Sequence, residues 1–280
     1  MIQSLIAPLT YGFMQRGLLA ALMVGVICAV IGCYVVLRSM AFLGDAMAHA
    51  ILPGIAVAYI VKGNLLVGGL IAAIIVALGI GFFSREGTIK EDTAIGIVFA
   101  AALSLGVALI STIASYASDL THILFGNILG VSQNDLWLTA GLGILVLAAV
   151  LVLFKEFMVM SFDPVLAATL RLPTNLLRNV MLILLALTIV ISLQTVGVGL
   201  VAAMLVTPAA TAYLLTRRLP AMMLVSAACG AFSAIVGLYL SYYVNIASGA
   251  AIVLVCTALF ILAFIFAPRR GLIKRLLHRR

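Results

Sequence analysis

Residues 44–54 read Gly-Asp-Ala-Met-Ala-His-Ala-Ile-Leu-Pro-Gly, with a carboxylate and an imidazole four positions apart in an otherwise apolar or small-residue run. On a helix, positions i and i+4 share one face, so the side chains of Asp45 and His49 reach toward one point. Ionisable residues inside membrane segments are costly and mark functional sites. The pair therefore predicts half of a metal-binding site. The alternative is a buried Asp–His hydrogen bond that only orients the helix.

The composition around this stretch defines the class of protein. Of 280 residues, 66% are hydrophobic and 9% are charged, and the mean hydropathy is +1.35. Repeated apolar runs near the length of a membrane span predict an all-α, polytopic bundle of about eight to nine transmembrane helices in one domain, 1–280. The expected runs are about 17–37, 46–61, 64–83, 94–114, 136–155, 176–193, 197–215, 221–243 and 246–266.

Two of these runs carry residues that interrupt helices. The second run contains Pro53 and Gly54, and the seventh contains Gly197, Gly199 and Pro208. Broken helices at membrane depth are tolerated where they line a cavity or pack on protein. We therefore expect these five residues to mark helix breaks along the wall of a transport pathway.

The net charge of +8 arises from short basic clusters between the apolar runs and from a basic tail, 268–280. If every run crosses the membrane, all Lys and Arg except Arg16 and Lys62 fall on one side, which the positive-inside rule makes cytoplasmic. The N-terminus then lies outside. A re-entrant second run would instead place the N-terminus inside and leave the later topology unchanged. This distribution explains the basic charge without nucleic-acid binding.

Two connections are longer than turns. The external one, about 115–135, contains Asp119, His122 and Asp135. These residues could meet a cationic substrate or a docking partner, although exposed loop charges need no special reason.

The cytoplasmic connection, about 156–175, predicts a short helix over about 163–172. Asp163 is a preferred N-cap and Pro164 a preferred first helical residue, while Pro173 ends the helix. Such a helix is too short to span the membrane. With Leu166 and Leu170 one turn apart, it is a surface for a partner protein or, alternatively, an interfacial anchor.

Several ordered motifs together give the chain a family resemblance. They are the run from Met40 to Gly54, Glu-Asp-Thr-Ala-Ile-Gly-Ile at 91–97, Leu-Phe-Gly-Asn-Ile-Leu-Gly-Val at 124–131, Ser-Phe-Asp-Pro at 161–164, Gly-Val-Gly-Leu at 197–200 and Leu-Val-Thr-Pro-Ala-Ala-Thr-Ala at 205–212. With them the chain resembles, over nearly its whole length, the permease subunit of metal-specific ABC importers, which handle manganese, zinc and iron. More weakly, the fold resembles that of vitamin B12 and siderophore import permeases. Arg171 stands where this family usually has glycine.

The resemblance implies partners and a site. Such a permease works in the bacterial plasma membrane as a pair, with a second copy or a paralogue. An extracellular or periplasmic metal-binding protein delivers the metal, and each short cytoplasmic helix rests in a groove of an ATPase subunit. Asp45 and His49 match the family's metal-pathway positions. The coupling residues carried over are Asp163, Pro164, Leu166, Ala167 and Leu170.

The chain itself is not expected to be an enzyme. None of its four lysines follows a glycine, so it has no GxxxxGK[ST] phosphate loop, and ATP hydrolysis must come from a partner. Oxygen and nitrogen ligands without a thiolate pair suit manganese or iron, although zinc also accepts them. The run from Asp45 to Gly54 resembles the manganese and iron members more than the zinc members, and manganese is the expected metal. The metal is expected as transported substrate, with no permanently bound cofactor.

Two other functions compete with the importer. A secondary carrier driven by an ion gradient needs further intramembrane carboxylates, but every acidic residue except Asp45 falls in or next to a connection. An intramembrane metalloenzyme needs an HExxH-type pair and a third ligand, whereas the three histidines, at 49, 122 and 278, lie in separate regions.

Overall fold

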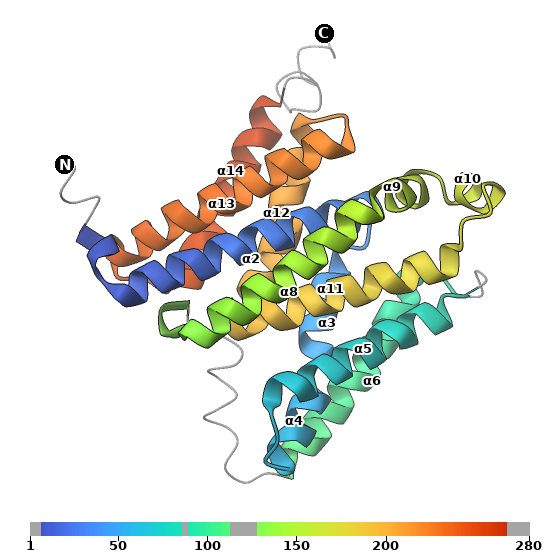
Figure 1. Ribbon diagram of the computed structural model, residues 1–280, viewed down its shortest axis with the longest axis horizontal. Coiled ribbons are helices and arrows are strands. Elements are labelled where there is room, and N and C mark those ends of the chain that lie inside the picture. Colours follow the sequence, from blue (N-terminus) through green and yellow to red (C-terminus); the bar gives the residue numbers. More distant parts are fainter. Residues whose placement is uncertain (1–6, 86–88, 113–127, 268–280) are drawn as a thin grey trace.

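The computed structural model describes residues 7–85, 89–112 and 128–267, and within them every regular element is a helix (Figure 1). In chain order these are η1 (Ala7–Thr10), α2 (Gly12–Leu37), α3 (Phe42–Ala50), α4 (Leu52–Ile60), α5 (Leu65–Phe83), α6 (Glu91–Ser111), η3 (Ile128–Gly130), α8 (Gln133–Val152), α9 (Phe154–Phe162), α10 (Pro164–Thr169), α11 (Thr174–Val196), α12 (Val198–Leu215), α13 (Leu219–Val244) and α14 (Ser248–Phe266).

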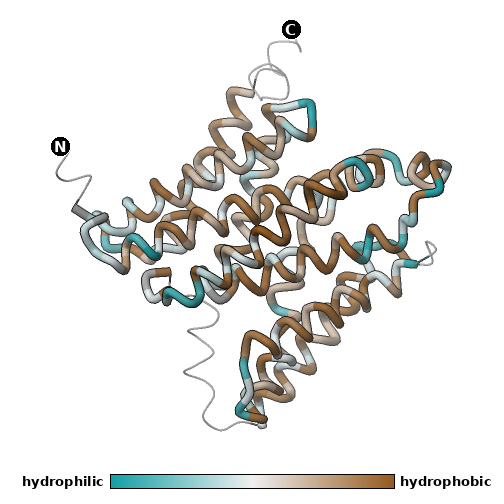
Figure 2. The backbone as a smooth tube through the Cα atoms, viewed as in Figure 1, coloured by the Kyte–Doolittle hydropathy of each residue, from teal (hydrophilic) through white to brown (hydrophobic). Residues whose placement is uncertain are grey.

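The long helices have the length and composition of membrane spans. Among the described residues, 8 candidate spans are found, with α3 and α4 counted together, and Gly199–Leu215 forms a shorter apolar helix. Figure 2 shows hydrophobic residues along the helices and hydrophilic ones mainly near their ends. The prediction of an all-α polytopic bundle is confirmed.

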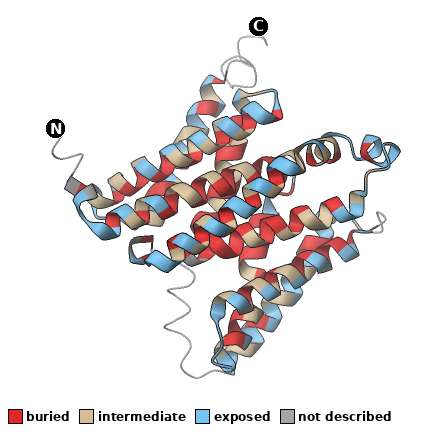
Figure 3. Cartoon of the chain, viewed as in Figure 1, coloured by how far each residue is buried: buried red, intermediate tan, exposed pale blue. Residues whose placement is uncertain are grey.

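Helix α2 lies at the centre of the bundle and packs most extensively against α13 and α12 (Figure 3). Glycine allows these close approaches, because a Cβ on Gly32 would collide with the backbone carbonyl of Leu205 in α12. Gly25 of α2 meets Gly230 of α13 in the same way. Small residues at such contacts let helix backbones pack closely where lipid offers no hydrophobic drive for association.

The second apolar run breaks at Ile51, between α3 and α4, and not at Pro53-Gly54. Pro53 lies in the first turn of α4, where its missing N–H costs no intrahelical hydrogen bond. Gly54 instead provides close packing, because a Cβ there would collide with the Gly68 carbonyl of α5. The prediction of an interrupted run was right, and the position of the break was wrong by two residues.

The junction of α11 and α12 confirms one predicted break and corrects another. Gly197 has φ 82° and ψ 164°, a backbone conformation that favours glycine, and it separates the two helices. Gly199 lies exposed in the first turn of α12. Pro208 lies inside α12 without ending it, so it is not a break.

The connection predicted to be cytoplasmic contains two short helices, α9 and α10. Asp163 caps α10 as predicted, since its Oδ1 accepts hydrogen bonds from the N–H groups of Val165 and Leu166 at 3.0 and 2.9 Å. The helix ends at Thr169, earlier than predicted, and Arg171 then adopts a left-handed conformation with φ 55°. Glycine is favoured in this conformation, which explains the glycine expected at Arg171 from the family resemblance.

Asp135 has a structural role at the start of α8. It forms a capping box with Ser132, in which the Ser132 hydroxyl accepts from the Asp135 N–H and an Asp135 carboxylate oxygen accepts from the Ser132 N–H. Asp135 thus lies in the first turn of a helix and not in the loop where it was expected, and its capping role favours a structural function over substrate or partner binding. Asp119 and His122 lie outside the described residues.

The close contact between α4 and α5 requires a glycine at position 54, and this requirement can be tested. We expect Gly54→Ala to lower the free energy of unfolding by about 1–3 kcal/mol, because the added methyl forces the two helices apart. Thermal unfolding of the purified protein in detergent measures this effect. Gly141→Ala is the matched control, since a Cβ at that α8 position meets nothing within 4 Å. Equal melting temperatures for the two variants would contradict the close-packing role.

Candidate metal centre

The structure brings Asp45 and His49 together on one face of α3. The His49 Nε2 lies 3.8 Å from the Asp45 Oδ1, and the two side chains are 31% and 49% exposed, respectively. This distance is too long for a hydrogen bond. The alternative of a buried Asp–His hydrogen bond therefore finds no support in the geometry.

The rest of α3 is directed into the protein. Its other residues are buried apart from Phe42, so Phe42, Asp45 and His49 form a single open stripe along the helix. Helices α6 and α12 pack against α3, and a Cβ on Gly44 would meet the Leu205 side chain of α12 at 3.4 Å. The packing thus fixes which face of α3 stays open, and that face carries both candidate ligands.

The two ligand atoms are spaced suitably for one cation. Metal bonds to carboxylate oxygen and imidazole nitrogen are roughly 2.0–2.2 Å long, so two ligands of a single ion are separated by less than the sum of two such bonds. The observed 3.8 Å between Nε2 and Oδ1 meets this condition. Within the described residues, no group of three or more His, Cys, Asp or Glu side chains could hold a metal. One chain therefore offers a partial ligand set.

Phe99 of α6 forms an aromatic wall beside the pair. Its ring centroid lies 6.5 Å from that of His49 and 5.8 Å from that of Phe42, the latter in an edge-to-face contact. The Phe99 ring therefore borders the imidazole, which stays partly exposed. The sequence did not single out Phe99, since aromatic residues are common in apolar runs.

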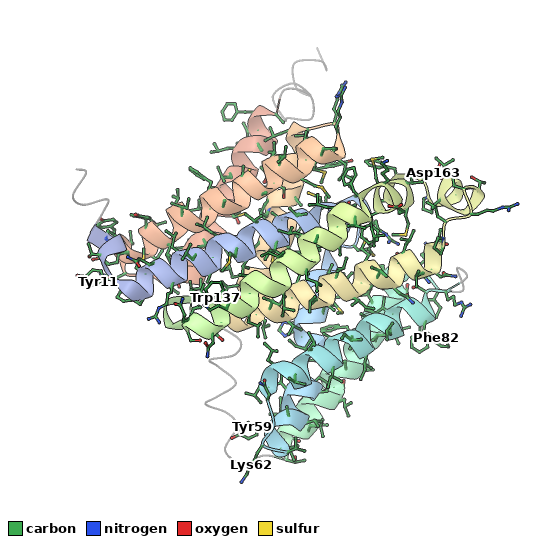
Figure 4. The ribbon with its side chains drawn as sticks, in the orientation of Figure 1. Tyr11, Tyr59, Lys62, Phe82, Trp137 and Asp163 are labelled. Carbon is green, nitrogen blue, oxygen red and sulfur yellow. The ribbon has the colours of Figure 1, made fainter. Side chains whose placement is uncertain are left out.

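The predicted helix-break residues are not gathered at this pair. Pro53 and Gly54 line an apolar hollow of about 610 Å³ between α4, α5 and α6, which begins at Ala50 next to His49 and reaches Asn64. Tyr59 and Lys62 lie at the far end of α4 in Figure 4. Gly197 and Gly199 lie at the α11–α12 junction. The role of these residues as a pathway wall stays a prediction.

The predicted coupling residues occupy a separate surface, at the end of the molecule where Asp163 is seen in Figure 4. Leu166 and Leu170 are exposed, as a partner contact requires, but Ala167 is completely buried and packs within its own subunit. The sequence missed two further exposed apolar side chains here, Phe162 and Val165. We call the exposed residues Phe162, Val165, Leu166 and Leu170 the α9–α10 patch.

Known proteins resemble this chain over nearly its whole length. The profile of the ABC 3 transport family matches residues 10–267. The manganese transport system membrane protein MntC of Halalkalibacterium halodurans is 48% identical over 95% of this chain and 91% of its own length. The manganese import system permease protein ScaB of Streptococcus gordonii is 42% identical over 98% of this chain and 99% of its own length.

Two solved structures share the fold. PsaBC from Streptococcus pneumoniae, in complex with Fab, superposes with a TM-score of 0.86 at 38% identity, covering 99% of this chain and 100% of that chain. An inward-facing metal-chelate type ABC transporter gives a TM-score of 0.70 at 16% identity over 89% of this chain and 85% of its own, and it supports the fold alone.

The predicted type of protein is thereby confirmed. A match of this extent supports a membrane subunit of an ABC transporter and not a carrier driven by an ion gradient. The motifs, the helical bundle and the relatives together show that this chain belongs to the ABC 3 transport family.

Proposed function

We propose that this chain is the permease subunit of an ATP-driven importer of manganese. The observation that carries the proposal is the open stripe of α3, where Asp45 and His49 stand 3.8 Å apart within a candidate membrane span. An intramembrane carboxylate that faces away from its own bundle must face protein or water, because hydrocarbon does not solvate it. The names of the relatives support manganese as the substrate.

The ligand chemistry is consistent with this metal. Carboxylate oxygen suits manganese, while soft thiolates select zinc and other thiophilic metals. The described cysteines do not supply a thiolate pair, since Cys28, Cys33 and Cys256 are buried in the core. There the Cys28 sulfur lies 3.4 Å from the Ser192 hydroxyl oxygen. Iron and zinc remain alternatives that competition for uptake would separate from manganese.

A second permease subunit would complete the site. A two-fold arrangement of identical chains that places the two α3 stripes face to face would supply two carboxylates and two imidazoles. It would also cover the exposed Asp45. Separation of the subunits would then halve the number of ligands, so the metal would be released without any chemical change at the ligands. A heterodimer with a paralogue works in the same way if the paralogue supplies equivalent ligands.

The energy and the cargo would come from other proteins. The α9–α10 patch would dock on an ATPase subunit on the cytoplasmic side of the bacterial plasma membrane, and Asp163 would fix the start of the docking helix. A metal-binding protein would deliver manganese on the opposite side. Interfacial anchoring is the competing role for α10. Such anchors favour basic faces that carry Trp, whereas no Trp is found among the exposed apolar residues of the patch.

The metal site is tested by removing its ligands. We expect Asp45→Asn and His49→Gln each to reduce manganese accumulation by at least about tenfold, because the first removes the carboxylate charge and the second removes the imidazole nitrogen. Uptake of radioactive manganese by cells with equal membrane levels of the protein measures this. Lys62→Ala, which changes an exposed charge at the end of α4, should leave uptake unchanged. Normal uptake in both ligand variants would remove the site assignment.

The docking surface is tested by placing charge on the exposed leucines. The double variant Leu166→Asp, Leu170→Asp should fail to co-purify with the ATPase subunit and should lose uptake, because a charge desolvated in an apolar groove is strongly unfavourable. Manganese binding by the permease should persist. Val244→Asp introduces the same charge at an exposed position of α13 and serves as control. Normal assembly of the double variant would place the coupling surface elsewhere.

A further inference from the structure

A charged cluster that shares no residue with the open stripe of α3 connects the end of α2 to the start of α6. The Arg38 Nη2 lies 2.8 Å from the Glu91 Oε2, and the two side chains are only 14% and 22% exposed. Arg38 is the C-cap of α2 and lies four positions before Phe42, the first residue of α3. Glu91 is the first residue of α6. The ion pair therefore fixes the α2–α3 junction to the start of the helix that carries Phe99.

Arg178 of α11 makes a second connection at the same end of the bundle. Its Nη1 donates to the Ser84 carbonyl and its Nη2 to the Gly81 carbonyl, both at 3.0 Å. Carbonyls in the last turn of a helix lack intrahelical partners, so the guanidinium caps the end of α5. Arg178 thus attaches α5 to α11, and α11 begins five positions after α10 ends.

The two connections are close enough to act on each other. Arg178 interacts electrostatically with Glu91, which attracts it, and with Arg38 and Arg85, which repel it. Arg38 also approaches α11 directly, since its Nη1 lies 3.9 Å from the Met181 sulfur. The cluster therefore links the ends of α2, α5 and α6 to the first turns of α11.

The cluster also retains unused hydrogen-bonding capacity. In the described part of the chain, the Glu91 Oε1 and the Arg178 Nε are buried without a hydrogen-bond partner. Buried polar atoms without partners cost free energy, so an arrangement that pairs them is favoured when the helices shift. One acceptor and one donor of opposite charge are thus available for a second set of bonds.

We propose that Arg38, Glu91 and Arg178 are positioning residues that transmit the displacement of α10 to the metal-site helix α3. The proposal rests on the proposed importer function. A push on α10 moves the start of α11, Arg178 carries this movement to α5 and toward Glu91, and the Arg38–Glu91 pair carries it to the start of α3 and to α6. Phe99 on α6 then shifts against His49. None of the three residues contacts the metal.

The experiment measures transport and ATP hydrolysis together, in the full complex with its ATPase reconstituted in liposomes. Glu91→Gln and Arg178→Met should each lower the number of manganese ions imported per ATP by about tenfold, the usual size of a coupling effect between sites. The rate of ATP hydrolysis and the Kd for manganese should stay within about twofold of wild type. The substituted residues lie in neither the ATPase site nor the metal site, and substitutions distant from a site have little effect on it. Lys90→Gln is the matched control, because it removes an exposed charge next to Glu91.

A charge exchange separates transmission from simple stabilisation. The double variant Arg38→Glu, Glu91→Arg restores the attraction and should recover at least half of the wild-type ratio of imported ions to ATP, whereas each single exchange should not. Arg178→Lys keeps the charge but not the paired donors and should be intermediate. If transport and ATP hydrolysis fall in parallel in the variants that fold, or if the exchange recovers nothing, the three residues are structural only.

The failure of this proposal is distinguishable from failure of the proposed function. A wild-type complex that imports no manganese on addition of ATP, or an Asp45→Asn complex that imports it normally, would refute the importer assignment or its metal site. A wild-type complex that transports, combined with an unchanged ratio in Glu91→Gln and Arg178→Met, would refute the transmission proposal alone.

Discussion

The exposure of a carboxylate on one face of α3 is the constraint on which the rest of the structure depends. A charged side chain in hydrocarbon costs at least about 2.5–3.5 kcal/mol, so Asp45 needs a polar or protein-covered surrounding. The other faces of α3 cannot give it, since they are filled by close packing against α6 and α12. The subunit thus leaves one stripe uncovered, and in a membrane that stripe must face protein or water.

Close helix packing determines which face of α3 stays exposed. Gly44 and the alanines at positions 46, 48 and 50 give α3 a narrow cross-section, so its neighbours approach it closely. Gly32 and Gly54 bring α2 and α4 equally close to α12 and α5. Helices packed in this way transmit movement as rigid bodies, because well-packed interiors do not deform continuously. Charged side chains connect some of these helices at their ends, as Arg38 does with Glu91 and Arg178 with the last turn of α5.

The sequence predicted features that depend on neighbouring residues and missed those that depend on distant ones. The start of α10 was predictable because Asp163 and Pro164 carry the chemistry of a helix start themselves. Pro53 was misread as a break, although proline favours the first turn of a helix and so marks the helix that follows the break. Pro208 stays within α12 because a surrounding bundle compensates for a lost hydrogen bond.

In the candidate site, too, the features set by neighbouring residues were predictable and those set by distant residues were not. The i, i+4 spacing predicted that Asp45 and His49 share a face, because helix geometry alone determines this. Nothing local indicated that Phe99 would border the pair or that Ala167 would turn inward, since both depend on which helix packs beside them. The partnership of Arg38 and Glu91 spans 53 positions in sequence and was equally invisible.

A partial ligand set gives a transporter an advantage that a complete one lacks. A site with all its coordinating side chains on one rigid subunit would hold the metal equally well in every arrangement of the assembly. A metal ion that binds two states with equal affinity does not shift the equilibrium between them. Two ligands on one chain, with the rest supplied from across an interface, make affinity depend on how the subunits are placed. ATP hydrolysis could then change metal affinity through subunit movement alone, with the protonation and the identity of the ligands unchanged.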